Sequence, residues 1–179
     1  RSVVWRFMKP VTNDVGMRLV NAAKYHLPET FDSSGSFLES HVAFAFLLDY
    51  VPNWRNAYGD AGFIQYQLFL PDGTARKGMA DALRLCQKHD VVSYLGVFKR
   101  HRPDEYLLSH GLDGWSLALD FAVPSDAERL WKLTRELTAL VLDAGGTFYP
   151  AKDQVVDAAS FAKAFGPRLT RFMELQRSL

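Results

Sequence analysis

The chain has 179 residues, of which 48% are hydrophobic and 23% are charged. These fractions are ordinary for a globular protein and exclude a disordered, a collagen-like or a disulfide-rich chain. The 21 Lys and Arg residues nearly balance the 20 Asp and Glu residues, whereas a nucleic-acid-binding domain usually carries a clear basic excess, so no nucleic-acid partner is expected. The single cysteine excludes an internal disulfide and a zinc site built on several thiolates.

The two ends of the chain indicate a part of a longer protein. The chain begins with Arg1 instead of Met, and residues 175–179 still read as helix. The sequence contains no signal peptide and no apolar run of the roughly 18 residues that a transmembrane segment needs. Together with the lone Cys86, this favours a cytoplasmic location, with attachment at a membrane surface as the alternative.

Apolar spacing predicts the elements of the first part of the chain. Capping residues followed by apolar positions at helical spacing predict a helix at residues 10–26, and residues 29–37 have the composition of a loop. From His41 to Tyr50 bulky side chains alternate with mostly small ones, which predicts a strand.

A second alternation predicts a strand at residues 62–70. One face would carry Ile64, Tyr66, Leu68 and Leu70, and the other Phe63, Gln65, Gln67 and Phe69. A turn at residues 71–73 and a helix to about residue 88 follow. The inward residues of this helix are expected to be Met79, Ala82, Leu83 and Cys86.

The remaining elements are predicted in the same way. Strands are expected at residues 91–99 and 115–123, and the less bulky face of the second carries Ser116, Ala118, Asp120 and Ala122. Pro124 and Ser125 precede an amphipathic helix that ends at Gly145 and Gly146. A short strand at residues 147–149 and one or two helices within residues 157–178 complete the chain.

This order of strands and helices predicts an α+β fold with an antiparallel or mixed, ferredoxin-like sheet and helices on one face. On the second face of the sheet, Gln65 and Gln67 lie together on one strand, and Ser116, Ala118 and Asp120 lie together on another. If both sets share that face, they form a polar floor. This polar floor is either a solvated sheet face or a site that hydrogen-bonds a polyhydroxylated ligand or a ring with carbonyl groups. The five histidines show no metal-ligand spacing, so no metal site is expected.

Several segments, in this order, resemble the substrate (cap) domain and C-terminal region of FAD-linked oxidases of the vanillyl-alcohol oxidase superfamily, most closely its decaprenylphosphoryl-ribose oxidase group. The resemblance runs from about residue 40 to the end and rests on residues 53–59, 62–67, 96–99, 114–121 and 145–153. It implies that residues 1–146 form a cap domain and residues 147–179 a segment returning to an N-terminal FAD-binding domain. It also implies oxidation of a small-molecule alcohol or sugar by hydride transfer to flavin.

The resemblance further implies roles for particular residues. Lys152 would act beside the flavin and the substrate hydroxyl, where a cation can stabilise developing negative charge, and Tyr149 would pack near the flavin. The residues that would line the substrate pocket are Tyr58, Gln65, Gln67, Lys99, Ser116 and Ala118.

The chain departs from that group at the pocket. Its members typically carry Asn and Cys where this chain has Ser116 and Ala118, and an aromatic residue where it has His101, so the substrate is left open between a sugar, a sugar phosphate and another polyol. A relative of the sterol reductases or aldonolactone oxidases is one alternative. A stand-alone α+β domain that binds a small ligand on the same face without enzymatic activity is the other.

Overall fold

The computed structural model describes residues 3–31, 38, 40–45, 52–152 and 155–179. These residues form two compact units, Arg1–Phe63 and Ile64–Leu179. The functional division at residues 146 and 147 does not coincide with this boundary and stays a prediction.

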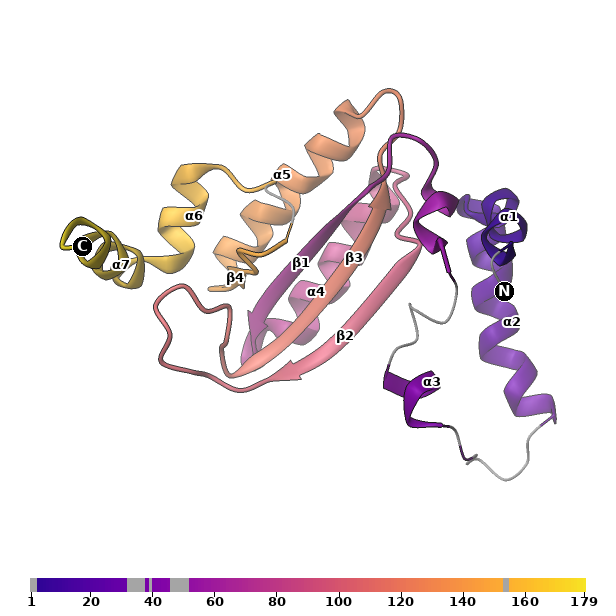
Figure 1. Cartoon of the computed structure of the whole chain (residues 1–179), viewed down its shortest axis with the longest axis horizontal. Helices are drawn as coiled ribbons and strands as arrows, with labels where there is room; N and C mark the ends of the chain where they lie inside the picture. Colours follow the sequence, from indigo (N-terminus) through magenta and orange to yellow (C-terminus); the bar gives the residue numbers. More distant parts are fainter. Residues whose placement is uncertain (1–2, 32–37, 39, 46–51, 153–154) are drawn as a thin grey trace. The chain divides into compact units, whose positions relative to one another are not determined.

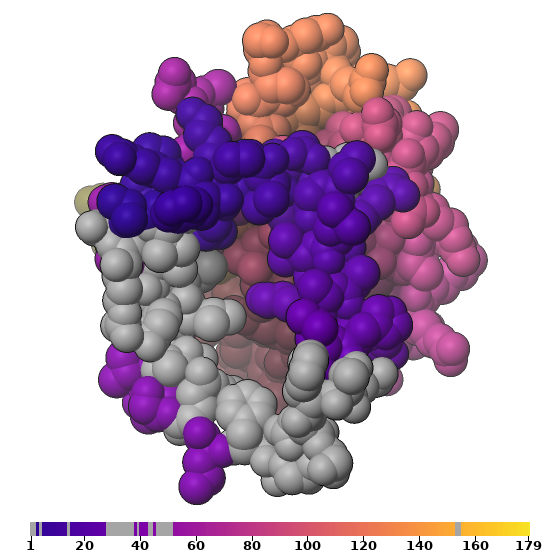
Figure 2. All heavy atoms as spheres, turned by 90° about the vertical axis from the view of Figure 1, so that its right-hand side faces the viewer, coloured from indigo at the N-terminus to yellow at the C-terminus, as the bar shows by residue number. Residues whose placement is uncertain are grey.

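The first unit is helical in its described part. Helix α1 covers Val4–Met8, the 3-10 helix η1 covers Lys9–Val11, and helix α2 covers Asp14–Phe31. The Asn13 side chain accepts a hydrogen bond from the Gly16 backbone N–H at 2.9 Å, which caps the start of α2. A short helix α3 spans His41–Ala45, and η2 spans Trp54–Tyr58. The indigo and violet atoms of Figure 2 belong to this unit.

Two predictions for this unit need correction. The helix expected at residues 10–26 is confirmed from Asp14 but continues to Phe31, so the loop composition of residues 29–31 did not end it. Residues 41–45 form α3 instead of the expected strand. A short apolar run does not distinguish helix from strand by periodicity, and alternating alanines favour helix. The rest of that expected strand, residues 46–50, lies outside the described residues.

The second unit is an α+β fold, as predicted. Its four-stranded sheet has the order β2-β3-β1-β4, with β1 at Phe63–Pro71, β2 at Leu95–His101, β3 at Gly114–Ala122 and β4 at Thr147–Phe148. Strands β2 and β3 pair antiparallel, as do β1 and β4. Helices α4 (Asp72–Lys88) and α5 (Glu128–Asp143) lie on one face of the sheet (Figure 1). This is the strand order of a split β-α-β, ferredoxin-like fold.

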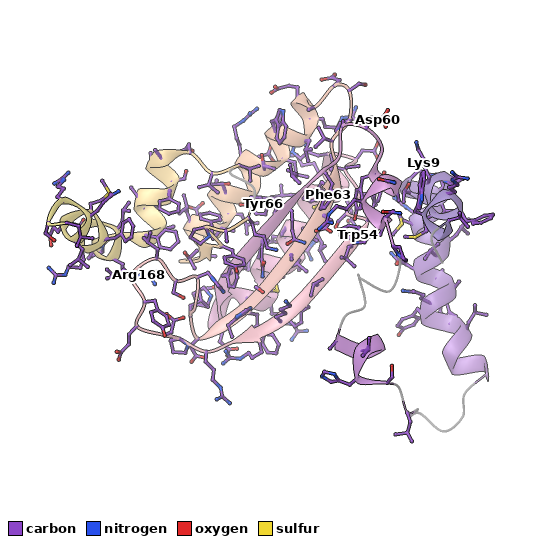
Figure 3. All side chains as sticks on the ribbon, viewed as in Figure 1. Lys9, Trp54, Asp60, Phe63, Tyr66 and Arg168 are labelled. Carbon is purple, nitrogen blue, oxygen red and sulfur yellow. The ribbon has the colours of Figure 1, made fainter. Side chains whose placement is uncertain are left out.

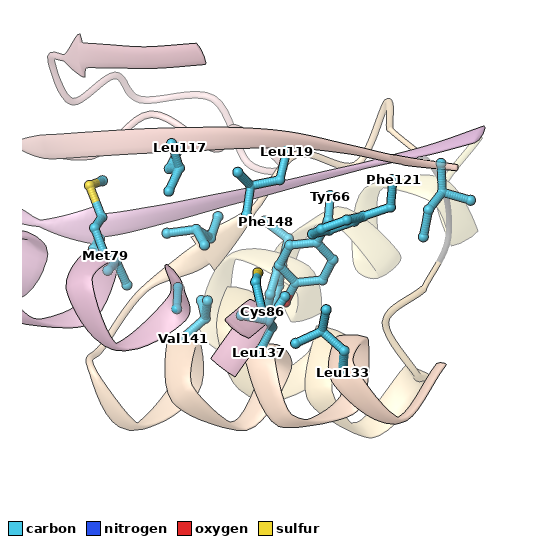
Figure 4. Packing of buried hydrophobic residues seen from close by; sticks show 14 of the residues in the cluster. Tyr66, Met79, Cys86, Leu117, Leu119, Phe121, Leu133, Leu137, Val141 and Phe148 are labelled. Carbon is cyan, nitrogen blue, oxygen red and sulfur yellow. The ribbon is translucent and has the colours of Figure 1, made fainter. Parts of the chain in front are cut away.

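The hydrophobic core lies between the sheet and these two helices. Tyr66, Leu117, Leu119 and Phe121 of the sheet point toward Leu133, Leu137 and Val141 of α5 and Met79 and Cys86 of α4 (Figure 4). The alternation predicted for β1 is confirmed, because Ile64, Tyr66, Leu68 and Leu70 are all buried in this cluster. The amphipathic helix predicted before Gly145 is also confirmed as α5, whose buried face includes Leu130, Leu133, Leu137 and Val141.

Three further differences from the predictions concern helix α4 and its ends. Helix α4 begins at Asp72, so residues 71–73 do not form a separate turn. Leu83 is 48% exposed, because it follows Ala82 and is therefore rotated by about 100° from the buried stripe of α4. Strand β2 begins at Leu95 instead of residue 91, since the Val91 N–H donates to the Cys86 carbonyl at 3.0 Å and thus completes the end of α4.

Helix α5 ends as predicted, at two glycines. The Gly145 N–H donates to the Leu142 carbonyl at 3.2 Å and the Gly146 N–H to the Val141 carbonyl at 2.8 Å, which is the Schellman pattern. Gly145 has φ +72°, a conformation that glycine adopts without strain. The chain then enters β4 and two C-terminal helices, α6 (Ala158–Phe165) and α7 (Pro167–Arg177), where one or two helices were predicted. Across the described residues, no helix combines the length and the apolar character needed to cross a membrane.

Candidate functional site

The sheet face away from α4 and α5 carries the polar residues that the sequence analysis placed together. In the β2–β3 register Leu95 lies opposite Asp120, Val97 opposite Ala118 and Lys99 opposite Ser116. Paired residues of neighbouring strands point to the same face. The side chains of Gln65 and Gln67 contact this row from β1, so the predicted polar floor is present.

Hydrogen bonds connect these polar groups across three strands. The Gln65 amide donates to the buried Asp120 carboxylate at 2.5 Å, and the Gln67 amide donates to the Ser116 hydroxyl at 3.1 Å. Ser116 is also 2.8 Å from Nε2 of His101 on β2. Ser116 and Asp120 are 0% and 1% exposed, so a ligand above this face would not contact them directly.

An aromatic cluster lies beside this polar network. Phe69 is fully buried, and its ring centroid is 4.8 Å from that of His101 and 4.6 Å from that of His110. Tyr149 packs on His110 at 4.2 Å between ring centroids. Partial burial lowers the pKa of both histidines, and the positive charges of His110, Lys99 and Arg100 lower that of His101 further, while Asp104 partly opposes the shift of His110.

The loop between β2 and β3, which carries His110, is held by its own polar groups. Asp104 accepts from the Ser109 hydroxyl at 2.5 Å and from the Tyr106 backbone N–H at 2.9 Å. These bonds lower the pKa of the Asp104 carboxyl, which therefore stays charged near neutral pH. Arg168 of α7, labelled in Figure 3, donates to the Ser109 carbonyl at 3.1 Å and ties the loop to the C-terminal helices. These hydrogen bonds hold the loop that carries His110.

A cleft of about 450 Å³ lies along the β1 edge, between β4, the segment after it, and helices α6 and α7. Its polar groups are Gln65, Gln67 and Lys152, and its walls are aromatic and aliphatic. The Lys152 ammonium is 5.5 Å from the ring centroid of Tyr149. The walls are formed by Tyr66, Phe148, Tyr149, Pro150, Val155, Val156, Ala158, Phe161 and Leu169. A cleft with apolar walls and a few converging polar groups is the usual form of a small-molecule site.

The structure brings together four of the predicted site residues. Gln65, Gln67, Tyr149 and Lys152 line this cleft. Ser116 and Ala118 lie on β3 behind the glutamines, at 0% and 5% exposed.

The other two predicted residues lie outside the cleft lining. Lys99 is exposed on β2 opposite Ser116. Tyr58 belongs to the first unit, where its ring stacks on Phe63 at 4.5 Å and lies 5.9 Å from Trp54 between ring centroids. Trp54 and Phe63 are labelled in Figure 3. The roles that the resemblance gives to all these residues stay predictions.

Sequence reasoning did not identify three residues of this region as site residues. In the sequence, His101 marks a departure from relatives, Asp120 belongs to a predicted sheet face, and the histidine spacing predicts no metal site. The position of His101 two residues after Lys99 on a strand was a usable signal, because it places both on one face. No comparable signal existed for His110, which lies in a loop. The described residues include no group of three or more His, Cys, Asp or Glu side chains arranged to hold a metal ion.

Comparison with known proteins identifies a relative of this chain. No protein-family model matches the chain. Over 133 residues, which are 74% of this chain, it is 33% identical to decaprenylphosphoryl-β-D-ribose oxidase of Mycolicibacterium smegmatis. The matched part spans only 28% of that protein's length. The similarity confirms the resemblance indicated by the motifs: over part of that protein's length, this chain is a relative of decaprenylphosphoryl-β-D-ribose oxidase.

Proposed function

We propose that this chain is the substrate-binding part of an FAD-dependent oxidoreductase that oxidises an alcohol group of a sugar or another polyol. In this proposal residues 1–146 are the cap domain, residues 147–179 return to an N-terminal FAD-binding domain of the same protein, and the enzyme works in the cytoplasm. One observation carries the proposal: Gln65, Gln67 and Lys152 converge on one apolar-walled cleft in a chain that is similar to a sugar-linked oxidase.

The residues of the cleft fit a flavin and a hydroxylated substrate. FAD, when bound, supplies the hydride acceptor, while the protein supplies orientation and electrostatics. The aromatic ring of Tyr149 and the aliphatic walls suit a planar ring system, and the amides of Gln65 and Gln67 suit hydroxyl groups. The Lys152 ammonium would stabilise negative charge that develops on the substrate oxygen or on the reduced ring.

The first experiment tests whether the whole protein is a flavoprotein. The full-length reading frame that contains this chain is expressed, and the purified protein is examined for the absorbance of oxidised flavin. We expect a yellow protein that releases FAD on denaturation, and whose flavin is bleached anaerobically by a member of a panel of glycerol, ribitol, D-ribose and D-ribose 5-phosphate. A colourless protein without flavin would refute the proposal and support the stand-alone binding domain.

The second experiment tests the role of Lys152. In the flavoprotein, Lys152→Ala is expected to slow flavin reduction by about 100-fold or more, because the cation that stabilises the developing charge is removed. Lys132→Ala, at an exposed position of α5, is the matched control and should leave the rate unchanged. Stopped-flow reduction gives the rates, and thermal unfolding shows whether both variants fold. An unaltered reduction rate in Lys152→Ala would contradict the assigned role.

A further inference from the structure

His101 and Ser116 form a link between strands that the proposed function does not use. Lys99 lies opposite Ser116 in the β2–β3 register, and His101, two residues further along β2, lies opposite Gly114. His101 and Ser116 are therefore diagonal neighbours on one sheet face, with Nε2 and Oγ 2.8 Å apart. Ser116 also contacts the Gln67 amide, which lines the cleft.

The hydroxyl of Ser116 restricts the protons of both partners. A serine hydroxyl has one hydrogen to donate and accepts through its lone pairs, and an amide nitrogen can only donate. With the Gln67 nitrogen directed at Oγ, the Ser116 hydrogen needs an acceptor, and Nε2 of His101 is the acceptor within reach in the described part of the chain. Because Ser116 is fully buried, bulk water does not reach this hydroxyl. His101 is then neutral, with its proton on Nδ1.

Protonation of His101 reverses this arrangement of hydrogen bonds. A protonated His101 carries hydrogen on both ring nitrogens, so Nε2 must donate to Ser116. The Ser116 hydrogen is then directed at Gln67, which can accept it only through its carbonyl oxygen. The Gln67 amide must therefore rotate by half a turn, and its NH₂ group, instead of its oxygen, is turned away from Ser116.

We propose that His101 is a positioning residue that sets, through Ser116, which end of the Gln67 amide faces the cleft. With neutral His101 the Gln67 oxygen faces the cleft and accepts a hydrogen bond from a hydroxyl of the substrate. With protonated His101 the NH₂ group faces the cleft and favours a ligand that presents an acceptor oxygen. The inference rests on the proposed function only for the identity of the hydroxylated ligand.

The groups around His101 favour the neutral state near neutral pH. Its own strand contributes Lys99 and Arg100, and the loop after β2 contributes His110, all of which repel a positive charge on the ring. Strand β1 contributes the uncharged Phe69 ring at 4.8 Å. The carboxylate of Asp104 acts on His110. Partial burial and these neighbours lower the pKa of His101, so the switch to the protonated state is expected in mildly acidic solution.

The test uses NMR on the ¹⁵N-labelled full chain. A long-range proton–nitrogen correlation spectrum shows which ring nitrogen of a histidine is protonated, and the Gln67 NH₂ signals report the amide. We expect the Nδ1–H form of His101 at about pH 7. As the pH is lowered below about 6.5, the Gln67 signals should shift with the same midpoint as His101. An Nε2–H form at neutral pH, or Gln67 signals that stay constant while His101 titrates, would overturn the proposal.

Three variants separate this coupling from general effects of pH. Ser116→Ala should leave the titration of His101 but abolish that of the Gln67 signals. His101→Phe, which keeps a ring on Phe69, should abolish the Gln67 transition as well. His110→Phe is the matched control and should keep the transition, with a higher midpoint because one neighbouring positive charge is gone. A transition that persists in both Ser116→Ala and His101→Phe would refute the link. A full-length protein without flavin would instead refute the proposed function and leave these NMR results unaffected.

Discussion

Gly114→Ala tests how closely strands β1 and β3 must approach for the polar network to form. A Cβ atom built on Gly114 overlaps the carbonyl oxygen of Leu70 and lies 2.9 Å from its carbonyl carbon. Next to this point, the Asp72 N–H donates to the Asp113 carbonyl at 3.1 Å. The substitution therefore places a methyl group against the backbone of the neighbouring strand, which cannot move aside as a flexible side chain would.

The size of the effect follows from these distances. Because real Cβ atoms essentially never come closer than 3.0 Å to such an atom, the strands must separate locally by about 1 Å. An N–H···O bond lengthened by that amount is lost, and each lost bond costs about 1 kcal/mol in addition to the strain of overpacking, which costs about 1–3 kcal/mol. We expect Gly114→Ala to lower the free energy of unfolding by about 3 kcal/mol.

Urea denaturation followed by circular dichroism measures this change, with Gly73→Ala as the matched control. Gly73 lies in the first turn of α4, and a Cβ atom there meets nothing within 4 Å. The control should be stabilised by about 0.5–1 kcal/mol, because alanine is the better helix former. If Gly114→Ala unfolds within about 0.5 kcal/mol of the parent protein, the close approach of the two strands is not required and this reasoning is wrong.

Three further predictions concern pH and two buried hydroxyl groups. His101 and His110 have folded-state pKa values below the ordinary 6.5, so the two histidines bind more protons in the unfolded chain than in the folded one. The free energy of unfolding, measured by urea denaturation, should therefore be at its full value above about pH 6.5 and fall as the pH decreases below it. The double variant with phenylalanine at both positions should show a flatter profile, and an equally steep one would contradict this assignment. Thr147→Val should raise the unfolding free energy by up to about 1 kcal/mol, because the buried Thr147 hydroxyl has no hydrogen-bond partner in the described part of the chain; a loss of more than that amount would show that a partner exists. Tyr66→Phe should lower the free energy of unfolding by about 1 kcal/mol, since the buried phenol contacts the Thr138 hydroxyl at 3.1 Å. Thr138→Val should lower it by more, because it leaves the buried phenol without this partner. The reverse order of the two variants in thermal unfolding would argue against this bond.

The sequence predicted best the elements whose apolar pattern decides their burial. Strand β1 and helix α5 were expected at nearly their observed bounds, because their apolar faces form the core. The strand predicted from His41 was wrong at residues 41–45, because an alternation of bulky and small apolar side chains also fits a helix. The start of β2 was displaced by four residues, because the end of α4 uses the Val91 N–H.

For the candidate site, strand parity alone placed the two glutamines on one face and Ser116, Ala118 and Asp120 on one face. The strand predicted at residues 147–149 placed Lys152 shortly after its end. The sequence alone could not show which residues of different strands contact each other. Only the register and the strand order bring Gln67 to Ser116 and Ser116 to His101. The contact of His110 with Phe69 and Tyr149 was equally hidden, since it depends on how a loop folds back over the sheet.

The sequence by itself thus determined the class of fold, the relationship to a family of oxidases and the residue types available for hydrogen bonding, because these depend on local periodicity and on the order of motifs along the chain. The tertiary structure decided how those residues act together. Hydrogen bonds between side chains need donors and acceptors about 3 Å apart, and in this protein the partners Gln67 and Ser116 are 49 positions apart in the chain. The proton positions proposed for His101 and Ser116 follow from that spatial arrangement alone.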